Sequence, residues 1–347
     1  MKEVVVELSF PLVLDVLSTA TCVMLGLLFF TSKTKNRRAN IFLGLFLFSL
    51  GFEVLESFSE AIDGITHLNF NSELLTIVFL FFYVFFTFKN KFKKWLVLLC
   101  IPWLVVVVSN FDEELVKYIS YLFNISLLIF TLKQINEDQH RLKDFYSDLQ
   151  SRTLSWIKGI IYIFLIFHFF WIIEDIIDFS NSNITQYFAL VSTVLTFLII
   201  YWIGYNGFTQ SAMFSSVLFE IEKEEIVAEQ EYSKEKYTEI FELIEKEKFY
   251  TISNLNLKML SDLVNVREKE LSKLINSHSK TNFYQFINGF RVNEFKKLLQ
   301  SDKAKQLSIL GLAQEAGFVS KSTFYSAFKN LEGITPKQYQ NSLKKSE

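Results

Sequence analysis

Polar and basic side chains recur on one face of the segment SKSTFYSAFKN, residues 320–330. Residues three and four apart share a face of a helix, so Phe324 and Phe328 would point into a core together. The opposite face would carry hydrogen-bonding groups and cations, from Ser320, Lys321, Ser322, Tyr325, Ser326 and Lys329. A helix in the DNA major groove needs such a face to contact base edges and phosphates. We therefore expect these residues to contact DNA.

A short helix and a turn must position that segment. The residues before it would form an apolar helix face from Ile309, Leu312, Ala313 and Ala316. Gly317 takes positive φ at no steric cost and would form the turn, with Phe318 packed beneath it. Ser320 is a preferred N-cap residue for the second helix. The pattern predicts a helix-turn-helix unit.

A second copy of this pattern lies upstream, at LSDLVNVREKELSKLIN, residues 260–276. Asn265 stands at the turn, where it adopts the left-handed conformation more easily than most non-glycine residues. Arg267, Lys269 and Lys273 lie on its second helix and are candidate DNA contacts. The expected core comprises Leu260, Leu263, Val266, Leu271, Leu274 and Ile275.

A longer apolar pattern, NFYQFINGFRVNEFKKLLQ at residues 282–300, joins the two copies. A helix over residues 283–299 would be roughly 25 Å long at 1.5 Å per residue. With its flanking turns, it would hold two recognition helices about one DNA turn, ~34 Å, apart on one face.

These segments together resemble the DNA-binding domain of AraC/XylS-type transcription regulators. The resemblance covers about residues 237–340 and rests on LSKLIN, NFYQFINGFRVNEFKKLL, SILGLAQEAGF, SKSTFYSAFK and GITPKQY. It implies two helix-turn-helix units joined by a long helix, specific binding to double-stranded DNA, and RNA polymerase as a further partner. The chain departs from the family pattern at Ser261, Arg267 and Gln340. The family usually has a hydroxyl N-cap residue where Arg267 stands, so the first recognition helix would lack that cap.

The C-terminal part carries an excess of positive charge. From residue 241 onward there are 17 Lys and Arg and 11 Asp and Glu, an excess of six. The whole chain, in contrast, has a formal net charge of −2. A local excess of this kind agrees with phosphate binding by the C-terminal part.

The N-terminal part is of a different kind. The chain has 347 residues, is 50% hydrophobic and only 21% charged, and has a mean hydropathy of +0.26. A helix of about 20 apolar residues crosses the hydrocarbon core of a bilayer. Seven such spans are expected, at residues 10–31, 39–58, 71–88, 95–111, 115–133, 156–178 and 186–207.

Basic residues alternate between the loops that join these spans. The first, third and fifth loops contain the Lys and Arg residues Lys33, Lys35, Arg37, Arg38, Lys89, Lys91, Lys93, Lys94, Lys133, Arg141, Lys143 and Arg152. The alternate loops contain no Lys or Arg. Because basic loops stay in the cytoplasm, we expect an inner-membrane protein with its N-terminus outside and its C-terminal part inside. The first residues, MKEVVVELSF, lack the pattern of a cleaved signal peptide.

Three regions follow from these observations. Residues 1–207 would form a seven-span transmembrane sensor domain, residues 208–236 a cytoplasmic connector helix, and residues 237–347 the DNA-binding domain. The connector is rich in Glu and Lys, with a fragmentary apolar spacing at Phe214, Leu218, Ile221, Ala228 and Tyr232. This spacing is compatible with a solvated helix or with a short parallel coiled coil that would make a homodimer. The fold class is thus all-α.

A few ionisable side chains interrupt the expected spans. Such groups are costly in a bilayer and usually face a bundle interior. Candidates for a ligand-sensing site are Asp15, Glu53, Glu56, His168 and Glu174, with aromatic walls from Phe170, Trp171 and Trp202. No Lys or Arg inside the spans is expected to pair with these acids. They would bind a small cationic or hydrogen-bonding ligand or an ion, or sense protons, unless they lie in the headgroup region.

The sequence contains no catalytic motif, no paired metal ligands and no cofactor-binding loop. Cys22 and Cys100 both lie in apolar runs, which does not support a disulfide framework. We therefore expect no enzyme, but a membrane-anchored one-component transcription factor. The alternative is a transporter or passive membrane anchor fused to a DNA-binding domain that is constitutive or released by proteolysis.

Overall fold

The computed structural model describes residues 9–32, 36–60, 71–89, 92–108, 112–148, 154–177, 183–213 and 234–346. These residues form helices and no strand, apart from one isolated bridge between Tyr146 and Asn256. The all-α expectation is therefore confirmed for the part of the chain that the structure describes. The chain divides into two compact units, residues 1–136 with 154–224, and residues 137–153 with 225–347.

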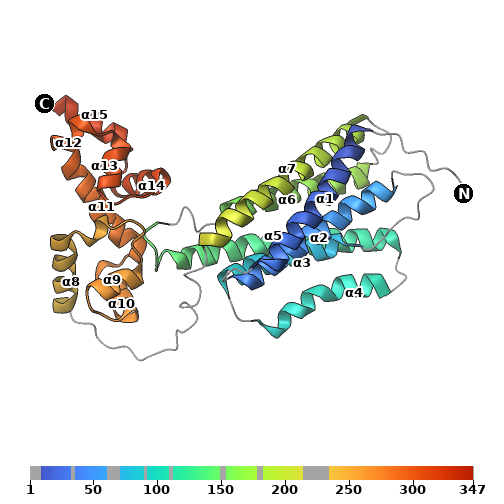
Figure 1. Ribbon diagram of the computed structural model, residues 1–347, viewed down its shortest axis with the longest axis horizontal. Coiled ribbons are helices and arrows are strands. Elements are labelled where there is room, and N and C mark those ends of the chain that lie inside the picture. The colour runs from blue at the N-terminus through green and yellow to red at the C-terminus, as the bar shows by residue number, and fades with distance from the viewer. Residues whose placement is uncertain are drawn as a thin grey trace, which may run out of the picture. The chain divides into compact units, whose positions relative to one another are not determined.

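The first unit is built from long apolar helices (Figure 1). They are α1 (Phe10–Thr31), α2 (Arg37–Glu60), α3 (Glu73–Phe88), η1 (Lys94–Cys100), α4 (Ile101–Val108), α5 (Glu113–Leu142), α6 (Ser155–Ile177) and α7 (Asn183–Met213). Each of the seven expected spans contains a helix. Among the described residues, five helices are long and apolar enough to cross a membrane: α1, α2, α5, α6 and α7. Residues Glu73–Phe88 and Lys94–Val108 form shorter apolar helices, so a bundle of seven full spans is not established.

Helices α1 and α2 pack closely through small residues. A Cβ atom added at Gly44 would lie 2.8 Å from the carbonyl oxygen of Gly26, which is too close for two non-bonded atoms. A Cβ atom added at Gly51 would lie 3.0 Å from the Cβ atom of Cys22. Small residues that bring two backbones together are typical of helices packed in a bilayer, where dispersion contacts replace the hydrophobic effect.

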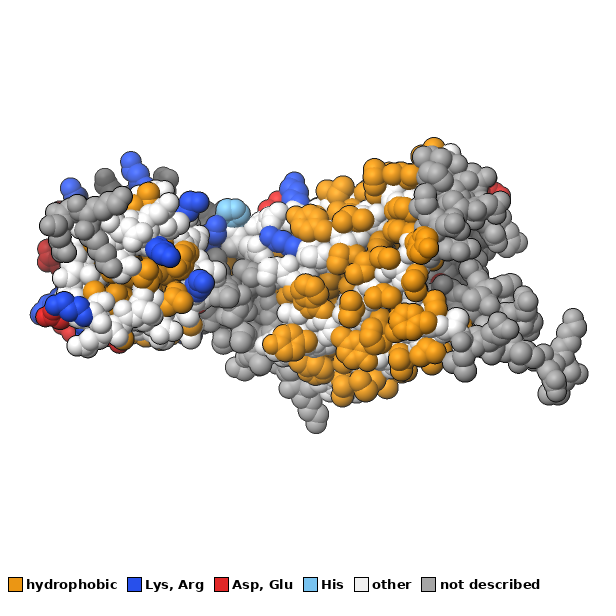
Figure 2. All heavy atoms as spheres, turned by 90° about the horizontal axis from the view of Figure 1, so that it is seen from above, with side chains coloured by type: hydrophobic (Ala, Val, Ile, Leu, Met, Phe, Trp, Pro, Cys, Tyr) orange, Lys and Arg blue, Asp and Glu red, His pale blue; other side chains and the backbone are white. Residues whose placement is uncertain are grey.

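The outer surface of the first unit is apolar. On the face that Figure 2 shows, hydrophobic side chains are spread over the described part of this unit. Leu122 on α5 is 72% exposed, Ile176 on α6 is 74% exposed, and Val108 on α4 is 78% exposed. Polar side chains such as Ser49, Thr76 and Asn124 are buried inside instead. Soluble monomers rarely expose apolar patches of this extent.

The second unit contains shorter, amphipathic helices. They are α8 (Lys234–Glu247), η5 (Phe249–Thr251), α9 (Leu257–Leu263), α10 (Glu268–Ser279), α11 (Phe283–Leu299), α12 (Lys303–Gln306), α13 (Ile309–Glu315), α14 (Lys321–Glu332) and α15 (Pro336–Ser346). α11 has the bounds that its apolar pattern predicts and begins with a capping box formed by Asn282 and Gln285. It contributes to two cores, one around α8–α10 and one around α13–α15 (Figure 1).

The second unit also includes a segment from the loop between α5 and α6. The Lys143–Asp148 segment packs among C-terminal helices that follow it by more than one hundred residues. The ring of Phe145 lies against the core of α8–α11, and its carbonyl oxygen accepts a hydrogen bond from the backbone N–H of Leu257 at 2.9 Å. The hydroxyl of Ser147, which is fully buried, donates to the carbonyl oxygen of Leu255 at 2.6 Å.

Three details differ from the expectations or lie outside the described residues. α7 extends to Met213, beyond the expected span end at residue 207. The expected coiled-coil positions between Phe214 and Tyr232 fall outside the described residues. Leu263 was expected in the core but is 43% exposed, because α9 ends there and turns this side chain outward.

Candidate functional sites

The second helix-turn-helix unit consists of α13, a turn and α14. Gly317 adopts a φ of 98°, and a Cβ atom there would lie 2.5 Å from the carbonyl oxygen of Tyr250. Glycine is therefore required both by the turn and by the close approach of the segment around Tyr250. Ser320 caps α14, because its hydroxyl accepts a hydrogen bond from the backbone N–H of Thr323 at 3.0 Å. Phe324 and Phe328 are fully buried, as the spacing predicts.

The opposite face of α14 presents most of the expected DNA contacts to solvent. Lys321, Ser322, Ser326 and Lys329 are exposed, whereas Ser320 and Tyr325 are half-buried. The Nζ atom of Lys321 lies 5.7 Å from the centre of the Tyr325 ring. Within the described residues, Lys321 and Lys329 form no ion pair with a carboxylate. Both cations are therefore available to a phosphate.

The first helix-turn-helix unit, α9 and α10, has the same construction with one weaker cap. Asn265 adopts a φ of 51° in the turn, as its residue type predicts. Arg267 stands at the N-cap of α10 and makes no side-chain capping bond, which agrees with its departure from the family pattern. Arg267 and Lys269 are exposed and Lys273 is half-buried. The structure thus holds these three candidates on one short helix and its cap.

Not every cation in the second unit is available to DNA. Arg291 on α11 is fully buried and donates to the carbonyl oxygens of Tyr250 and Ile252 at 2.7 and 3.1 Å. Burial lowers the pKa of this guanidinium to about 10. Lys248 pairs with Glu294 at 2.7 Å, and other lysines pair similarly. Arg291 is therefore structural, which a charge count along the sequence does not reveal.

The Lys143–Asp148 segment reaches both helix-turn-helix units. The carboxylate of Asp148, which is 5% exposed, accepts a hydrogen bond from the hydroxyl of Thr323 on α14 at 2.8 Å. The backbone oxygen of Ser147 accepts one from the Asn288 side chain on α11 at 3.0 Å. Burial raises the pKa of the Tyr284 phenol, and the nearby Asp148 carboxylate raises it further. Sequence reasoning assigned this segment to a membrane loop and gave it no role.

The first unit contains a polar cavity of about 440 Å³ between four of its helices. It is lined by Glu53, Glu56, Asn71, Glu73, Thr76, Ile77, Asn124, Phe164, His168 and Trp171. Glu53, Glu56 and His168 were expected to share a site, and the structure brings them together. Glu73 and Asn124 were missed, because Glu73 stands at the first residue of α3 and Asn124 is a single polar residue in an apolar run.

Other candidates lie elsewhere. Asp15 on α1 is half-buried and does not line the cavity, and the side chain of Glu174 lies outside the described residues. Trp202, an expected wall, is 51% exposed. Asp175, which follows Glu174 on α6, has a cation partner, because its carboxylate lies 2.8 Å from the Nζ atom of Lys117. This pair forms because Lys117, at the edge of its span, reaches across to α6.

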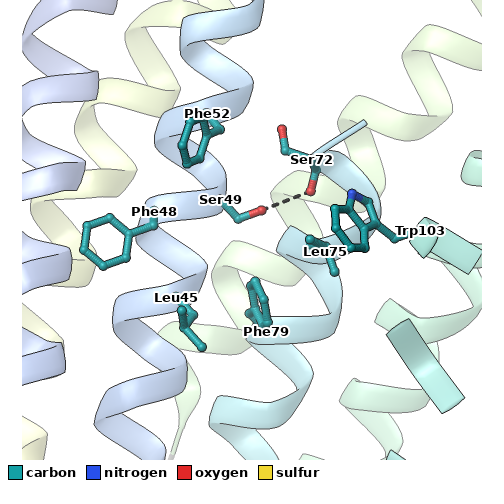
Figure 3. Close-up of a pocket in the computed structure, with 8 residues that line it drawn as sticks. All are labelled: Leu45, Phe48, Ser49, Phe52, Ser72, Leu75, Phe79 and Trp103. Atoms are coloured by element: carbon teal, nitrogen blue, oxygen red, sulfur yellow. Dashed lines mark hydrogen bonds between the residues drawn. The ribbon is translucent and has the colours of Figure 1, made fainter. Parts of the chain in front are cut away.

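A second, apolar pocket of about 270 Å³ lies against α2 and α3 (Figure 3). Its lining includes Phe52 of α2, Phe79 of α3 and Trp103 of α4, whereas the ring of Phe48 lies on the other side of α2 from Trp103. The only hydrogen bond drawn among these residues runs from the hydroxyl of Ser49 to the carbonyl oxygen of Ser72 at 3.0 Å. With so little polarity, this pocket offers no chemistry beyond contact with an apolar chain.

Comparison with known proteins finds a family match in the C-terminal part of the chain. A family model described as a helix-turn-helix domain matches residues 260–342, which span both helix-turn-helix units and α11. The match supports an AraC-type regulator that binds double-stranded DNA, and the family consists of DNA-binding regulators and not of enzymes. No curated protein and no solved structure significantly matches the chain.

Proposed function

We propose that this chain is a membrane-anchored one-component transcription factor. Its second unit binds a specific operator through α10 and α14, and its first unit anchors it in the inner membrane and senses a signal. The observation that carries the DNA-binding part is the exposed face of α14, with two cations that pair with no described carboxylate, in a domain that matches a helix-turn-helix family. The anchoring and the sensing rest on separate observations.

The chemistry of the two recognition helices suggests how they divide the work. Lys321 and Lys329 supply cations to phosphates or guanine edges, and Ser322, Tyr325 and Ser326 supply hydroxyls to base edges. In the first helix-turn-helix unit, the cations that contact phosphates or guanine edges come from Arg267, Lys269 and Lys273. Because α11 links the two helix-turn-helix units, a single DNA-binding domain reads two successive segments of the major groove.

Three observations support the membrane anchor. Five helices are long and apolar enough to cross a bilayer, apolar side chains cover their described surface, and small residues bring α1 and α2 together. The alternation of basic loops favours a cytoplasmic second unit. A reporter fused after residue 210 should then be cytoplasmic and one inserted at Asn181 should face outward. An outward C-terminus would refute the proposal, because DNA is inside.

The sensing role is supported by the polar cavity, which a passive anchor does not need. A ligand changes DNA binding only if it binds one arrangement of the protein better than another. Two protomers joined through the connector would place four helix-turn-helix units on one operator. A transporter or passive anchor remains the competing proposal. That proposal predicts that the Glu53→Gln variant and the wild type have the same target-promoter activity under every stimulus.

The central experiment measures operator affinity. Operators are first selected from random double-stranded DNA with the full chain in detergent micelles. Lys321→Ala should then weaken operator binding by roughly 5- to 150-fold, since loss of a base-contacting residue costs about 1–3 kcal/mol. The matched control is Lys305→Ala, because Lys305 is exposed but pairs with Asp302 at 2.9 Å. Equal affinities of the two variants would remove Lys321 from the interface.

A further inference from the structure

The polar cavity is lined by several acidic side chains. Its lining includes three carboxylates, from Glu53, Glu56 and Glu73, and no Lys or Arg among the described residues. Lys117 at the start of α5 does not line the cavity and pairs with Asp175 at 2.8 Å. Ionisable groups in such apolar surroundings are costly unless a partner compensates them.

Hydroxyl groups of the protein donate hydrogen bonds to two of these carboxyl groups. The hydroxyl of Ser72 donates to Glu56 at 2.9 Å, and the hydroxyl of Thr76 donates to Glu53. Both donors are neutral hydroxyls, which orient the carboxyl groups toward the cavity that they line. The arrangement therefore has the electrostatic character of a cation-binding site.

Asn124 provides an independent sign of a ligand. It is 1% exposed, lines the cavity from α5, and neither its amide nitrogen nor its amide oxygen has a hydrogen-bond partner. A buried amide without partners costs about 1–3 kcal/mol, so native proteins rarely leave one unsatisfied. A bound molecule with both a donor and an acceptor would satisfy it.

The rest of the lining favours an organic cation over a metal ion. The rings of Phe164 and Trp171 line the same cavity, and an aromatic face attracts an alkylammonium group. His168 donates from Nδ1 to the carbonyl oxygen of Phe164 at 2.8 Å, so in its neutral form Nε2 is an acceptor for an N–H group. The volume of about 440 Å³ is that of a small-molecule site. No group of three or more metal-ligating side chains that could hold a metal ion occurs in the described part of the chain.

We infer that this cavity binds a small organic ammonium compound, with Glu53, Glu56 and Glu73 facing its positive charge and Asn124 hydrogen-bonding its polar group. The inference rests on the proposed sensing role and names the class of signal. α5 supplies Asn124, and the residues of α5 from Glu137 onward belong to the unit that binds DNA. A ligand that orders Asn124 thus acts on a helix shared by both units.

The test measures thermal unfolding of the full chain in dodecyl maltoside, a detergent without charge or amine. Choline chloride and ethanolamine hydrochloride are titrated, because each joins an ammonium group to a hydroxyl that can donate to and accept from Asn124. The controls are 3,3-dimethylbutan-1-ol, the uncharged isostere of choline, and sodium chloride at matched ionic strength. We expect at least one ammonium compound to raise the unfolding temperature saturably, and neither control to do so. If neither ammonium compound exceeds the controls, the inference is wrong.

Variants locate the site. Glu73→Gln and Asn124→Leu should each raise the half-saturating concentration at least tenfold. Glu114→Gln is the matched control, because Glu114 is exposed on α5 and outside the cavity. Unchanged titrations of both cavity variants would overturn the assignment.

A measurement on the unaltered chain guards against variants that fail to fold. An apolar carbodiimide should modify Glu73, and the effective ammonium compound should slow this modification several-fold. Equal rates with and without that compound would also overturn the inference. Operator affinity is measured in the same samples. Absence of ammonium binding with intact operator binding would contradict only this inference, whereas absence of operator binding would contradict the proposed function.

Discussion

The first prediction concerns the hydrogen bond between Asp148 and Thr323, because it joins the loop between α5 and α6 to α14. The Thr323→Val substitution removes the donating hydroxyl and keeps the shape of the side chain. Thr323 is 6% exposed and Asp148 is 5% exposed, so water cannot readily replace the lost bond. A hydrogen bond to a charged group contributes about 1.5–3 kcal/mol.

This free energy should be visible as faster hydrogen exchange in the full chain. Amides of α14 that exchange through local opening should do so roughly 10- to 150-fold faster in Thr323→Val, since each 1.4 kcal/mol is tenfold. Mass spectrometry of peptides covering Lys321–Glu332 measures the rate. Ser322→Ala is the control on the same helix, because Ser322 is exposed and surface changes usually stay within about 0.5 kcal/mol.

A double-mutant cycle assigns the effect to the pair. If the bond stabilises α14, Asp148→Ala and Thr323→Val should be non-additive by about the energy of the bond. Asp148→Asn should retain part of the protection, since its amide oxygen still accepts. Additive effects, or unchanged exchange of α14 in Thr323→Val, would refute the claim that the Lys143–Asp148 segment holds this helix.

Further predictions concern the second unit and the connector. Phe324→Ala should destabilise the second helix-turn-helix unit by about 3–5 kcal/mol, measured as loss of exchange protection in α13 and α14; protection equal to wild type would contradict its buried position. Gly317→Ala should abolish operator binding, because its Cβ would lie 2.5 Å from the Tyr250 carbonyl oxygen; wild-type affinity would show that the turn can move. Burial raises the pKa of Tyr250 to about 12, above the usual value near 10. The folded state therefore favours the neutral phenol, and the stability that this contributes is present below about pH 10 and lost as pH rises toward 12. Tyr250→Phe should make the free energy of unfolding, measured by hydrogen exchange, depend less on pH in this range. The same pH dependence in the variant and the wild type would contradict this role of Tyr250. Ile221→Lys should reduce cross-linked dimers and cooperative operator binding if the connector pairs two chains, whereas unchanged yields would favour a solvated helix.

Local patterns predicted the parts of the fold that depend on neighbouring residues. The bounds of α1 and α11, the turns at Asn265 and Gly317, and the cap at Ser320 all follow from residue type and spacing within a few positions. The third span begins at Glu73 instead of residue 71, since a hydropathy pattern does not fix where a helix begins.

Contacts between distant segments were not predictable in the same way. Glu53 and Glu56 share a face of α2 by spacing, but whether Asp15 or Glu73 joins them depends on how neighbouring helices are rotated. Arg291 counted as one basic residue among many, and only packing shows that it is buried. The partner of Thr323 is 175 residues away in the chain, so no local pattern could indicate it.

The Lys143–Asp148 segment makes the DNA-binding unit discontinuous in the chain, with α6 and α7 inserted between its two parts. During synthesis at about 5–20 residues per second, Asp148 emerges roughly 9–35 s before Thr323, 175 residues later. The unit therefore completes its fold only after the ribosome has delivered two further apolar helices. A single protease cut between residues 214 and 233 would separate the Lys143–Asp148 segment from the helices that it holds, leaving Thr323 without its acceptor. Release by one cleavage would thus yield a less stable DNA-binding domain than the one that stays attached.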